Sequence, residues 1–373
     1  MNKAPLAGIK VIELARILAG PWIGQTLSDL GCDVIKVESE NGDDTRKWGP
    51  PWIDTDGEKT AAYFHSCNRG KKSITVDLKT AKGQQHVREL LADADILVEN
   101  FKVDGLQQYG LDAATVCKDF PQLIYCSVTG FGQTGPYAHR AGYDFMIQGM
   151  AGIMDLNGDP EGPPQKMGVA FADIFTGLYG VIGIQSALLQ RQQTGKGQHI
   201  DMSLFDCMSG VLANQSMNYL ASGASPTRMG NKHPNITPYQ TFPVSDGHLI
   251  IAVGNDQQFQ RLCKALNLDE LSEDSRYTSN SDRITHRDAL EVTLSAATVE
   301  WTRENLLDAL EIAVVPAGPI NTVADVFNDP QFQARGMRIN PDGIPGVRTP
   351  IVFSEAELST ERRAPRLGEH NSE

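Results

Sequence analysis

Short apolar, β-rich runs alternate with helical periodicity through the first 130 residues. The runs that predict strands cover residues 10–15, 32–38, 73–78, 95–100 and 123–128. Between them, residues 22–31 and 80–94 carry apolar side chains at helical spacing. Because strands that alternate with helices of this length are typical of βαβ units, the sequence predicts an α/β domain with a parallel sheet.

From about residue 141 the pattern is mainly helical, interrupted by a Gly- and Pro-rich segment at 156–166 that indicates a loop. A long apolar helix is expected to begin near Asp173 and to end in the turn "TGKGQ" at 194–198. The segment "HIDMSL", residues 199–204, then predicts one more strand.

The pattern changes again near residue 225, where a loop-like segment precedes a predicted strand at 248–254 and a helix at 255–267. We therefore expect a Rossmann-like large domain beginning with residues 1–224 and a smaller α+β domain over 225–325. Residues 326–373 are expected to return to the large domain.

Charge limits the partners, because 46 acidic residues exceed 33 basic ones and the net charge is −13. This balance argues against nucleic acid as a general partner, so any anionic ligand needs a local basic site. The six cysteines are scattered without a CxxC pair, as expected of reduced thiols. The N-terminus has no signal-type apolar core, and no stretch of about 18 uninterrupted apolar residues follows. We therefore expect a cytoplasmic protein without a membrane partner.

A single carboxylate, Asp173, stands in the apolar stretch "GVAFADIFTGLYGVIGIQSALLQ". An aspartate that opens a helix commonly accepts hydrogen bonds from free N–H groups and complements the helix dipole. The same position also suits a nucleophile, since the helix N-terminus favours the ionised form and burial beside Phe171 and Phe175 would remove water. A carboxylate that attacks an acyl group forms a mixed anhydride, which suits exchange between thioesters and carboxylic acids. Acid–base chemistry would need a second titrating group, and the sequence shows none beside Asp173.

Basic residues gather at three predicted strand ends, where ligands bind in open α/β sheets. The clusters are the "NRGKK" segment with Arg69, Lys71 and Lys72, the strand end at Arg16, and the glycine-rich connection with Arg140 and Tyr143. The strand at 95–100 ends at Asn100, which Phe101 and Lys102 follow. Each cluster alone could be a solvated loop, but together they fit one polyanionic small ligand.

Several segments carry a resemblance that covers nearly the whole chain in order. They are "LAGP", "DLGCDVIKVE", "NRGKKSI", "LVENF", "CSVTGFGQTGP", "RAGYD", "DIFTGLYG", "TGKGQHIDMSL", "VPAGPINT" and "APRLGEH". With them the chain resembles the class III CoA-transferases, the CaiB/BaiF or formyl-CoA transferase family. Within that family, "GDDTRKWGPP" and "AVGNDQQF" resemble succinyl-CoA:glutarate and related dicarboxylate CoA-transferases.

The resemblance implies that Asp173 is the catalytic nucleophile. It attacks an acyl-CoA thioester to form an aspartyl anhydride, which CoA converts to an aspartyl-CoA thioester; the acceptor carboxylate attacks that thioester, and CoA recaptures the new acyl group. Acyl-CoA is then a substrate, and no permanently bound cofactor is expected. The residues implied to contact CoA are Arg16, Arg69, Lys71, Lys72, Asn100, Phe101, Lys102, Arg140 and Tyr143.

The resemblance also implies an interlocked homodimer and a glycine loop that covers the reacting centre. Gly254 and Asn255 match that loop, although "VGND" is less glycine-rich than in some relatives. A dicarboxylate acceptor would need contacts for its second carboxylate. The candidates for these contacts are Arg228, Lys232, His233 and Arg261.

Two other functions stay open. The family includes α-methylacyl-CoA racemases, which carry a histidine base in an "AGHD" segment where this chain has "AGYD" with Tyr143. A phenol is a poor base near neutral pH, which disfavours a racemase. The second alternative is an acyl-CoA-binding protein without catalysis, which the retention of Asp173 disfavours. The eight histidines show no HxxxH or HxH spacing, so no metal site is expected.

Overall fold

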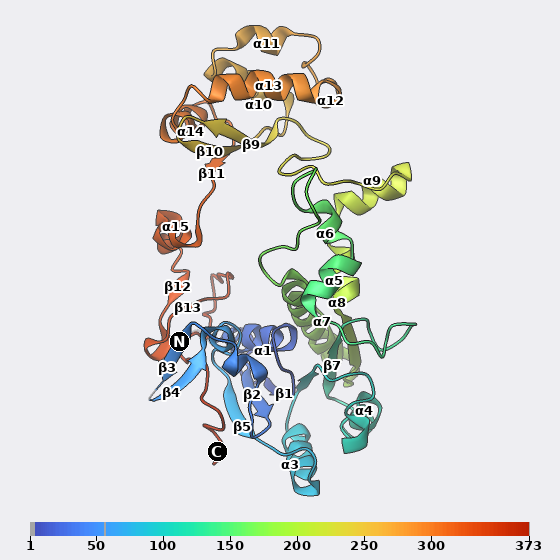
Figure 1. The fold of residues 1–373 in the computed structure, drawn as a ribbon. Helices are drawn as coiled ribbons and strands as arrows, with labels where there is room; N and C mark the ends of the chain where they lie inside the picture. The colour runs from blue at the N-terminus through green and yellow to red at the C-terminus, as the bar shows by residue number, and fades with distance from the viewer. Residues whose placement is uncertain (1–3, 56, 373) are drawn as a thin grey trace. The chain divides into compact units, whose positions relative to one another are not determined.

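The chain divides into two compact units in the computed structural model, which describes residues 4–55 and 57–372 (Figure 1). Unit 1 comprises Met1–Asp155, Lys166–Pro226 and Pro330–Glu373, and unit 2 comprises Leu156–Gln165 and Thr227–Asp329. The boundaries expected at 225 and 325 lie close to this division. The loop at 156–165, expected within the large domain, instead groups with unit 2.

Unit 1 is built on a six-stranded, all-parallel sheet of order β5-β2-β1-β6-β7-β8. The strands are β1 (Lys10–Glu13), β2 (Asp33–Glu38), β5 (Lys72–Thr75), β6 (Ile96–Glu99), β7 (Ile124–Thr129) and β8 (His199–Ser203). The chain adds strands outward from β1 to β5 and then returns to place β6 on the other side of β1. This reversal makes a topological switch point between β1 and β6, which is where open α/β sheets bind ligands.

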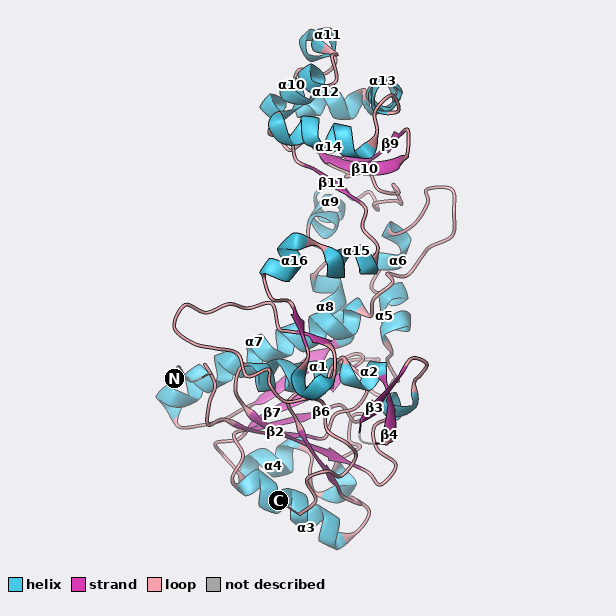
Figure 2. Ribbon diagram, turned by 90° about the vertical axis from the view of Figure 1, so that its left-hand side faces the viewer, coloured by secondary structure: helices cyan, strands magenta, loops and turns pink. Residues whose placement is uncertain are grey.

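Helices cover both faces of the sheet (Figure 2). Alternate residues of β1 enter different cores: Val11 packs with α1 (Ala19–Asp29) and α7 (Phe171–Thr194), and Ile12 with the opposite layer. That opposite layer contains α3 (Ala81–Ala92) and α4 (Ala113–Asp119).

Two glycines allow α7 to approach α1 closely. A Cβ at Gly180 would lie 2.4 Å from Ile23 Cδ1, and one at Gly177 would lie 2.9 Å from Trp22 Cδ1. Since neither methyl group fits, the glycines fix how near the N-terminal half of α7 lies to the helix that follows β1. Asp173 is therefore carried on a helix whose position is set by packing.

The C-terminal segment pairs with the outer edge of β5. His370 N donates to Ser73 O at 2.9 Å, and Thr75 N donates to Asn371 Oδ1 at 2.8 Å. The remaining elements of unit 1 are short. They are η1 (Asp44–Lys47), β3 (Trp52–Thr55), β4 (Glu58–Ala61), α2 (Ala62–His65), η2 (Gln107–Tyr109), α5 (Asp144–Met150), α6 (Ile153–Leu156, whose last residue belongs to unit 2), α8 (Leu204–Gly210), α9 (Asn214–Ser222), α16 (Pro330–Ala334), β12 (Arg338–Ile339), η3 (Pro341–Gly343) and β13 (Gly346–Val347).

Unit 2 is an α+β unit with an antiparallel sheet of order β11-β10-β9. Its strands are β9 (Tyr239–Val244), β10 (Gly247–Ala252) and β11 (Ala317–Pro319). Its helices are α10 (Asp256–Ala265), α11 (Asp269–Glu273), α12 (Asn280–Thr285), α13 (Arg287–Thr298), α14 (Arg303–Ile312) and α15 (Val323–Asn328). Phe242, Leu249 and Phe259 lie in its own core, separate from that of unit 1.

All six cysteines are free thiols. Within residues 4–55 and 57–372, α7 is the one helix with the length and hydropathy needed to cross a membrane. It contacts α1, α5 and α8, which is the packing of a core helix. The same residues contain no group of three His, Cys, Asp or Glu side chains placed to hold a metal ion.

Candidate active site

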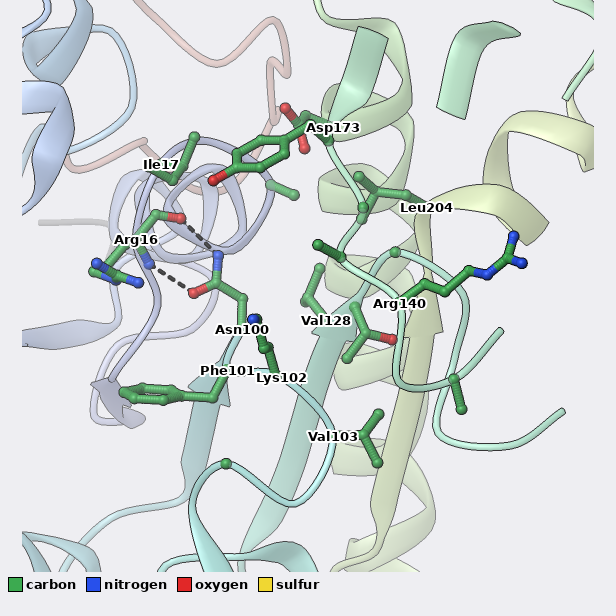
Figure 3. Close-up of a pocket in the computed structure, with 18 of the residues that line it drawn as sticks. Arg16, Ile17, Asn100, Phe101, Lys102, Val103, Val128, Arg140, Asp173 and Leu204 are labelled. Carbon is green, nitrogen blue, oxygen red and sulfur yellow. Dashed lines mark hydrogen bonds between the residues drawn. The ribbon is translucent and has the colours of Figure 1, made fainter. Parts of the chain in front are cut away.

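A pocket of about 410 Å³ opens at the carboxyl edge of the sheet, at the switch point between β1 and β6 (Figure 3). Its walls come from segments that follow three neighbouring strands, and Asp173 at the start of α7 completes it. Those segments are Arg16–Ala19 after β1, Asn100–Val103 after β6, and Val128–Gly130 at the end of β7. The connection containing Arg140 and Tyr143 closes one side.

Asn100 joins the two strand ends across the switch point. Arg16 N donates to Asn100 Oδ1 at 2.9 Å, and Asn100 Nδ2 donates to Arg16 O at 2.7 Å (Figure 3). These bonds occupy the amide group, so Asn100 shapes the pocket. The guanidinium of Arg16 forms an exposed pair with Asp44 at 3.1 Å.

Asp173 lies in the first turn of α7 but does not cap it. The N-cap residue is Ala170, and the Asp173 carboxylate accepts no hydrogen bond from any residue that the structure describes. Burial raises the pKa of Asp173 to about 7, and the charge of Asp144 adds to this effect. Burial therefore acts against the expected preference of the helix N-terminus for the ionised carboxylate.

Asp144, in α5, takes the capping role. Its Oδ1 accepts from Ala172 N at 2.9 Å, and its Oδ2 accepts from Gln148 Nε2 at 2.8 Å. Gln148 is fully buried, and its Oε1 accepts from Met167 N at 2.9 Å. Together they fix the backbone that leads into α7, and Asp144 is the second titrating group that the sequence did not reveal. The motif "RAGYD" contains Asp144, but of its residues only Arg140 and Tyr143 were predicted to lie at the site.

Tyr63, in α2, is another neighbour that sequence reasoning missed. Burial raises the pKa of its phenol, and the charge of Asp173 is the next contribution. Because 110 residues separate the two positions in a chain with no motif linking them, only the fold could bring them together. Tyr143 lines the pocket as expected and is 66% exposed.

The basic residues expected at the ligand separate into two groups. Lys102 and Arg140 line the pocket with Arg16, and the Arg140 guanidinium lies 4.0 Å from the centre of the Tyr137 ring. Lys102 forms no ion pair with any described residue.

The "NRGKK" cluster, by contrast, does not line the pocket. Arg69 pairs with Asp29 at 2.5 Å and Lys71 with Glu13 at 2.8 Å, and all four side chains are buried. Lys72 pairs with Asp33 at 3.5 Å. The prediction that Arg69 and Lys71 contact the ligand is corrected, because buried carboxylates take up their charges. Lys72 does not line the pocket, and its contact with the ligand stays a prediction.

A second, mostly apolar cavity of about 260 Å³ adjoins the first. It lies beyond the ends of β2 and β5 and shares Arg16, Phe101 and Tyr109 with the pocket of Asp173. Phe101 thus faces both spaces. An elongated ligand could therefore lie along the carboxyl edge of the sheet in unit 1.

The predicted lid and second-carboxylate residues belong to unit 2. Asn255 is the N-cap of α10 and accepts from Gln258 N at 2.9 Å, while Gly254 N donates to Gln258 Oε1 at 2.7 Å. Three of the four candidates hold partners within the unit: Lys232 pairs with Glu291, Arg261 donates to Val314 O, and His233 Nδ1 accepts from Asn235 N. Arg228 also takes part in an interaction.

A family model described as CoA-transferase family III matches residues 6–371. The chain belongs to CoA-transferase family III. This CoA-transferase is 56% identical over 380 residues to a succinate–glutarate CoA-transferase of Agrobacterium fabrum, covering 100% of the chain and 95% of that protein. It is 40% identical to the human succinyl-CoA:glutarate CoA-transferase, covering 100% of the chain and 85% of that protein.

Solved structures give the same assignment. The CoA-transferase superposes on a CaiB/BaiF family protein from Brucella suis with a TM-score of 0.90 and 66% identity, covering 100% of this chain and 98% of that one. A second match is Rv3272 from Mycobacterium tuberculosis, with a TM-score of 0.89 and 29% identity, covering 100% and 99% of the two chains. The mixed α/β fold with its six-stranded parallel sheet is thus confirmed as that of the family.

Proposed function

We propose that this enzyme transfers CoA from succinyl-CoA to glutarate or a similar dicarboxylate, through a covalent intermediate on Asp173. The observation that carries the proposal is a half-buried carboxylate without a hydrogen-bond partner among the described residues, set in the switch-point pocket. A carboxylate free of protein hydrogen bonds keeps its lone pairs for an incoming acyl carbon. The relatives named as succinate–glutarate CoA-transferases support the choice of substrates.

CoA fits the two adjoining cavities by chemistry and by length. The apolar cavity beside Phe101 and Tyr109 suits the adenine ring, and the phosphates would then pass near Arg16 and Lys102. The pantetheine arm would run through the larger pocket and bring the thioester to Asp173. In this placement Arg16 and Lys102 are the cations that contact the phosphates of CoA.

The reaction follows from the nucleophile. An ionised Asp173 oxygen attacks the thioester carbonyl, the C–S bond breaks, and CoA leaves as the thiolate. The thiolate attacks the Asp173 carbonyl of the mixed anhydride, which releases succinate and forms an aspartyl-CoA thioester. The acceptor carboxylate attacks that thioester to give a second anhydride and thiolate. The thiolate then attacks the acceptor's acyl carbon, which releases the new acyl-CoA and restores Asp173.

The predicted interlocked homodimer is part of this proposal. Exposed apolar side chains lie on α7 at Leu178 and Ile182 and on α9 at Leu220, and a second copy would remove them from water. The lid role of Gly254 and Asn255 stays a prediction. So does the cytoplasmic location, which the free cysteines favour.

The test is a trapping experiment on the nucleophile. The enzyme is mixed with succinyl-CoA, quenched with hydroxylamine or borohydride, and analysed by intact mass and peptide mapping. We expect an adduct on Asp173 that Asp173→Ala abolishes. The matched control is Asp206→Ala, which removes another first-turn aspartate, on α8, outside the pocket.

Three other outcomes would contradict the proposal. Full turnover by Asp173→Ala would exclude Asp173 as the nucleophile. Absence of any adduct, with solvent deuterium entering the α-carbon of a branched acyl-CoA, would make the protein a racemase. Silence in both assays with retained CoA binding would make it an acyl-CoA-binding protein.

A further inference from the structure

Ile17, in the first wall of the pocket, has a backbone conformation that its side chain disfavours. Its φ is +72°, in the left-handed region, where a β-branched residue is a steric outlier. Such strain persists only when surrounding contacts over-determine the backbone, and it concentrates at functional sites. The contacts that hold Ile17 therefore indicate what the pocket requires.

Asp43 holds the amide of Ile17. Ile17 N donates to both carboxylate oxygens of Asp43, at 3.2 and 3.3 Å, and Asp43 is fully buried. The same carboxylate accepts from Thr45 N at 3.0 Å and Thr45 Oγ1 at 2.8 Å. Although burial opposes the charge of Asp43, the ammonium of Lys36 holds the pKa of the Asp43 carboxyl below its usual range.

Lys36 holds Ala15, the residue at the start of the loop. Its ammonium lies 3.0 Å from Asp43 Oδ2, and it donates to Ala15 O at 2.8 Å and to Glu13 Oε1 at 3.0 Å. Lys71 completes the cluster, donating to Glu13 and, at 2.9 Å, to Pro21 O. The segment from Ala15 to the first turn of α1 is thus held at Ala15, at the strained Ile17 and at Pro21.

This cluster is costly for a purely structural purpose. The side chains of Glu13, Lys36, Asp43 and Lys71 are fully buried. Replacing a buried ion pair by well-packed apolar residues often leaves a protein equally stable. What apolar side chains could not do is accept the Ile17 amide and donate to two backbone carbonyls. The buried charges are therefore best explained by the backbone conformation of the pocket loop, which their hydrogen bonds fix.

We propose that Asp43 and Lys36 are positioning residues that hold Ile17 in its left-handed conformation, so that residues 16–19 form the wall against which CoA binds. The inference rests on the proposed function only in taking CoA as the ligand. Neither residue touches the reacting atoms. Asp43 also lines the adjoining cavity, but its carboxylate oxygens are taken up by Ile17, Thr45 and Lys36, so its effect on CoA is exerted through the loop.

A double-mutant cycle between Asp43 and Ile17 tests this coupling. The variants Asp43→Asn, Ile17→Gly and the double variant are titrated with free CoA by calorimetry, with thermal melts to confirm folding. We expect Asp43→Asn to weaken CoA binding about tenfold in the native background and no more than about twofold in the Ile17→Gly background. The reason is that glycine adopts a positive φ without strain and no longer needs Asp43.

The matched control is Asp29→Asn. It breaks a buried ion pair with Arg69, and the Asp29 carboxylate accepts from Thr349 and makes no contact with the pocket loop. We expect it to lower the melting temperature while CoA affinity stays within about twofold. If Asp43→Asn does not fold, Thr45→Val removes one hydrogen bond from Asp43 and takes its place in the cycle.

An equal loss of affinity from Asp43→Asn in both backgrounds would overturn the inference, as would an equal loss from Asp29→Asn. Turnover is measured separately on the native enzyme. If CoA binding shows the expected coupling between Asp43 and Ile17 but no CoA is transferred to glutarate, the proposed function is wrong, whereas the positioning role of Asp43 and Lys36 stands.

Discussion

Charges at the centre of the sheet and charges at the pocket are arranged in opposite ways. Glu13 and Lys36 are register partners in β1 and β2, and Lys71 reaches the same carboxylate, so that each buried charge is neutralised inside the protein. In the pocket, Lys102 and Asp173 lack an ion-pair partner among the described residues. The comparison teaches that charges which are paired and buried serve the fold, whereas a ligand site keeps charges that are unpaired or, like the Arg16–Asp44 pair, exposed to solvent.

The largest expected effect is on the paired side of this comparison. Arg69→Met should lower the free energy of unfolding by about 3–5 kcal/mol, because it leaves Asp29 charged and buried. Lys102→Met should change it by less than about 0.5 kcal/mol, since Lys102 is exposed. Urea denaturation measures both. Similar losses of unfolding free energy in the two variants would contradict the difference between paired, buried charges and the charges of the pocket.

The unpaired carboxylate should itself cost stability. Asp173→Asn should raise the free energy of unfolding at pH 8 by roughly 2 kcal/mol, about half of what its pKa shift alone implies, because solvent screens a half-buried group. The folded-state pKa of about 7 exceeds the ordinary value of 3.8. The native enzyme therefore loses stability relative to the variant as pH rises from about 4 to 7, with no further change above. Melting curves from pH 4 to 8 measure the gap, and a constant gap would refute this.

The pocket cations should act on binding. Lys102→Ala and Arg140→Ala should each raise KM for succinyl-CoA about tenfold, the loss of one charge-assisted contact, with kcat little changed. Added salt should reduce the difference. Lys196→Ala, at an exposed lysine in the turn after α7, is the matched control and should leave KM unchanged. A fall in kcat without a change in KM would contradict this role.

The smallest expected effect concerns Asp144. Removing its charge by Asp144→Asn should lower the pKa of Asp173 by less than about one unit, because burial is the larger cause of the shift. Since Asp173 must be ionised to attack, the acid limb of the kcat/KM profile should move to lower pH by that amount. A shift to higher pH would show that Asp144 does not act through its charge.

The sequence predicts the strands well and their side-chain partners poorly. The runs at 10–15, 32–38 and 95–100 coincide with β1, β2 and β6, since apolar β-rich runs between helical periods mark a buried parallel sheet. The pairing of Lys71 with Glu13 depends on β1 lying inside the sheet, which spacing along the chain does not encode. Asp144 and Tyr63 were missed for the same reason. Their effect on Asp173 exists only once α2, α5 and α7 are packed.

The C-terminal pairing on β5 also bears on how the protein is made. Thr75 and Asn371 are hydrogen-bonded although 296 residues separate them. A ribosome therefore releases β5 long before the segment that covers its outer edge has been translated. Until then the nascent sheet exposes a row of free N–H and C=O groups, the feature that draws strands of other molecules. Chaperones that shield such edges should bind nascent chains halted near residue 330 far better than completed ones.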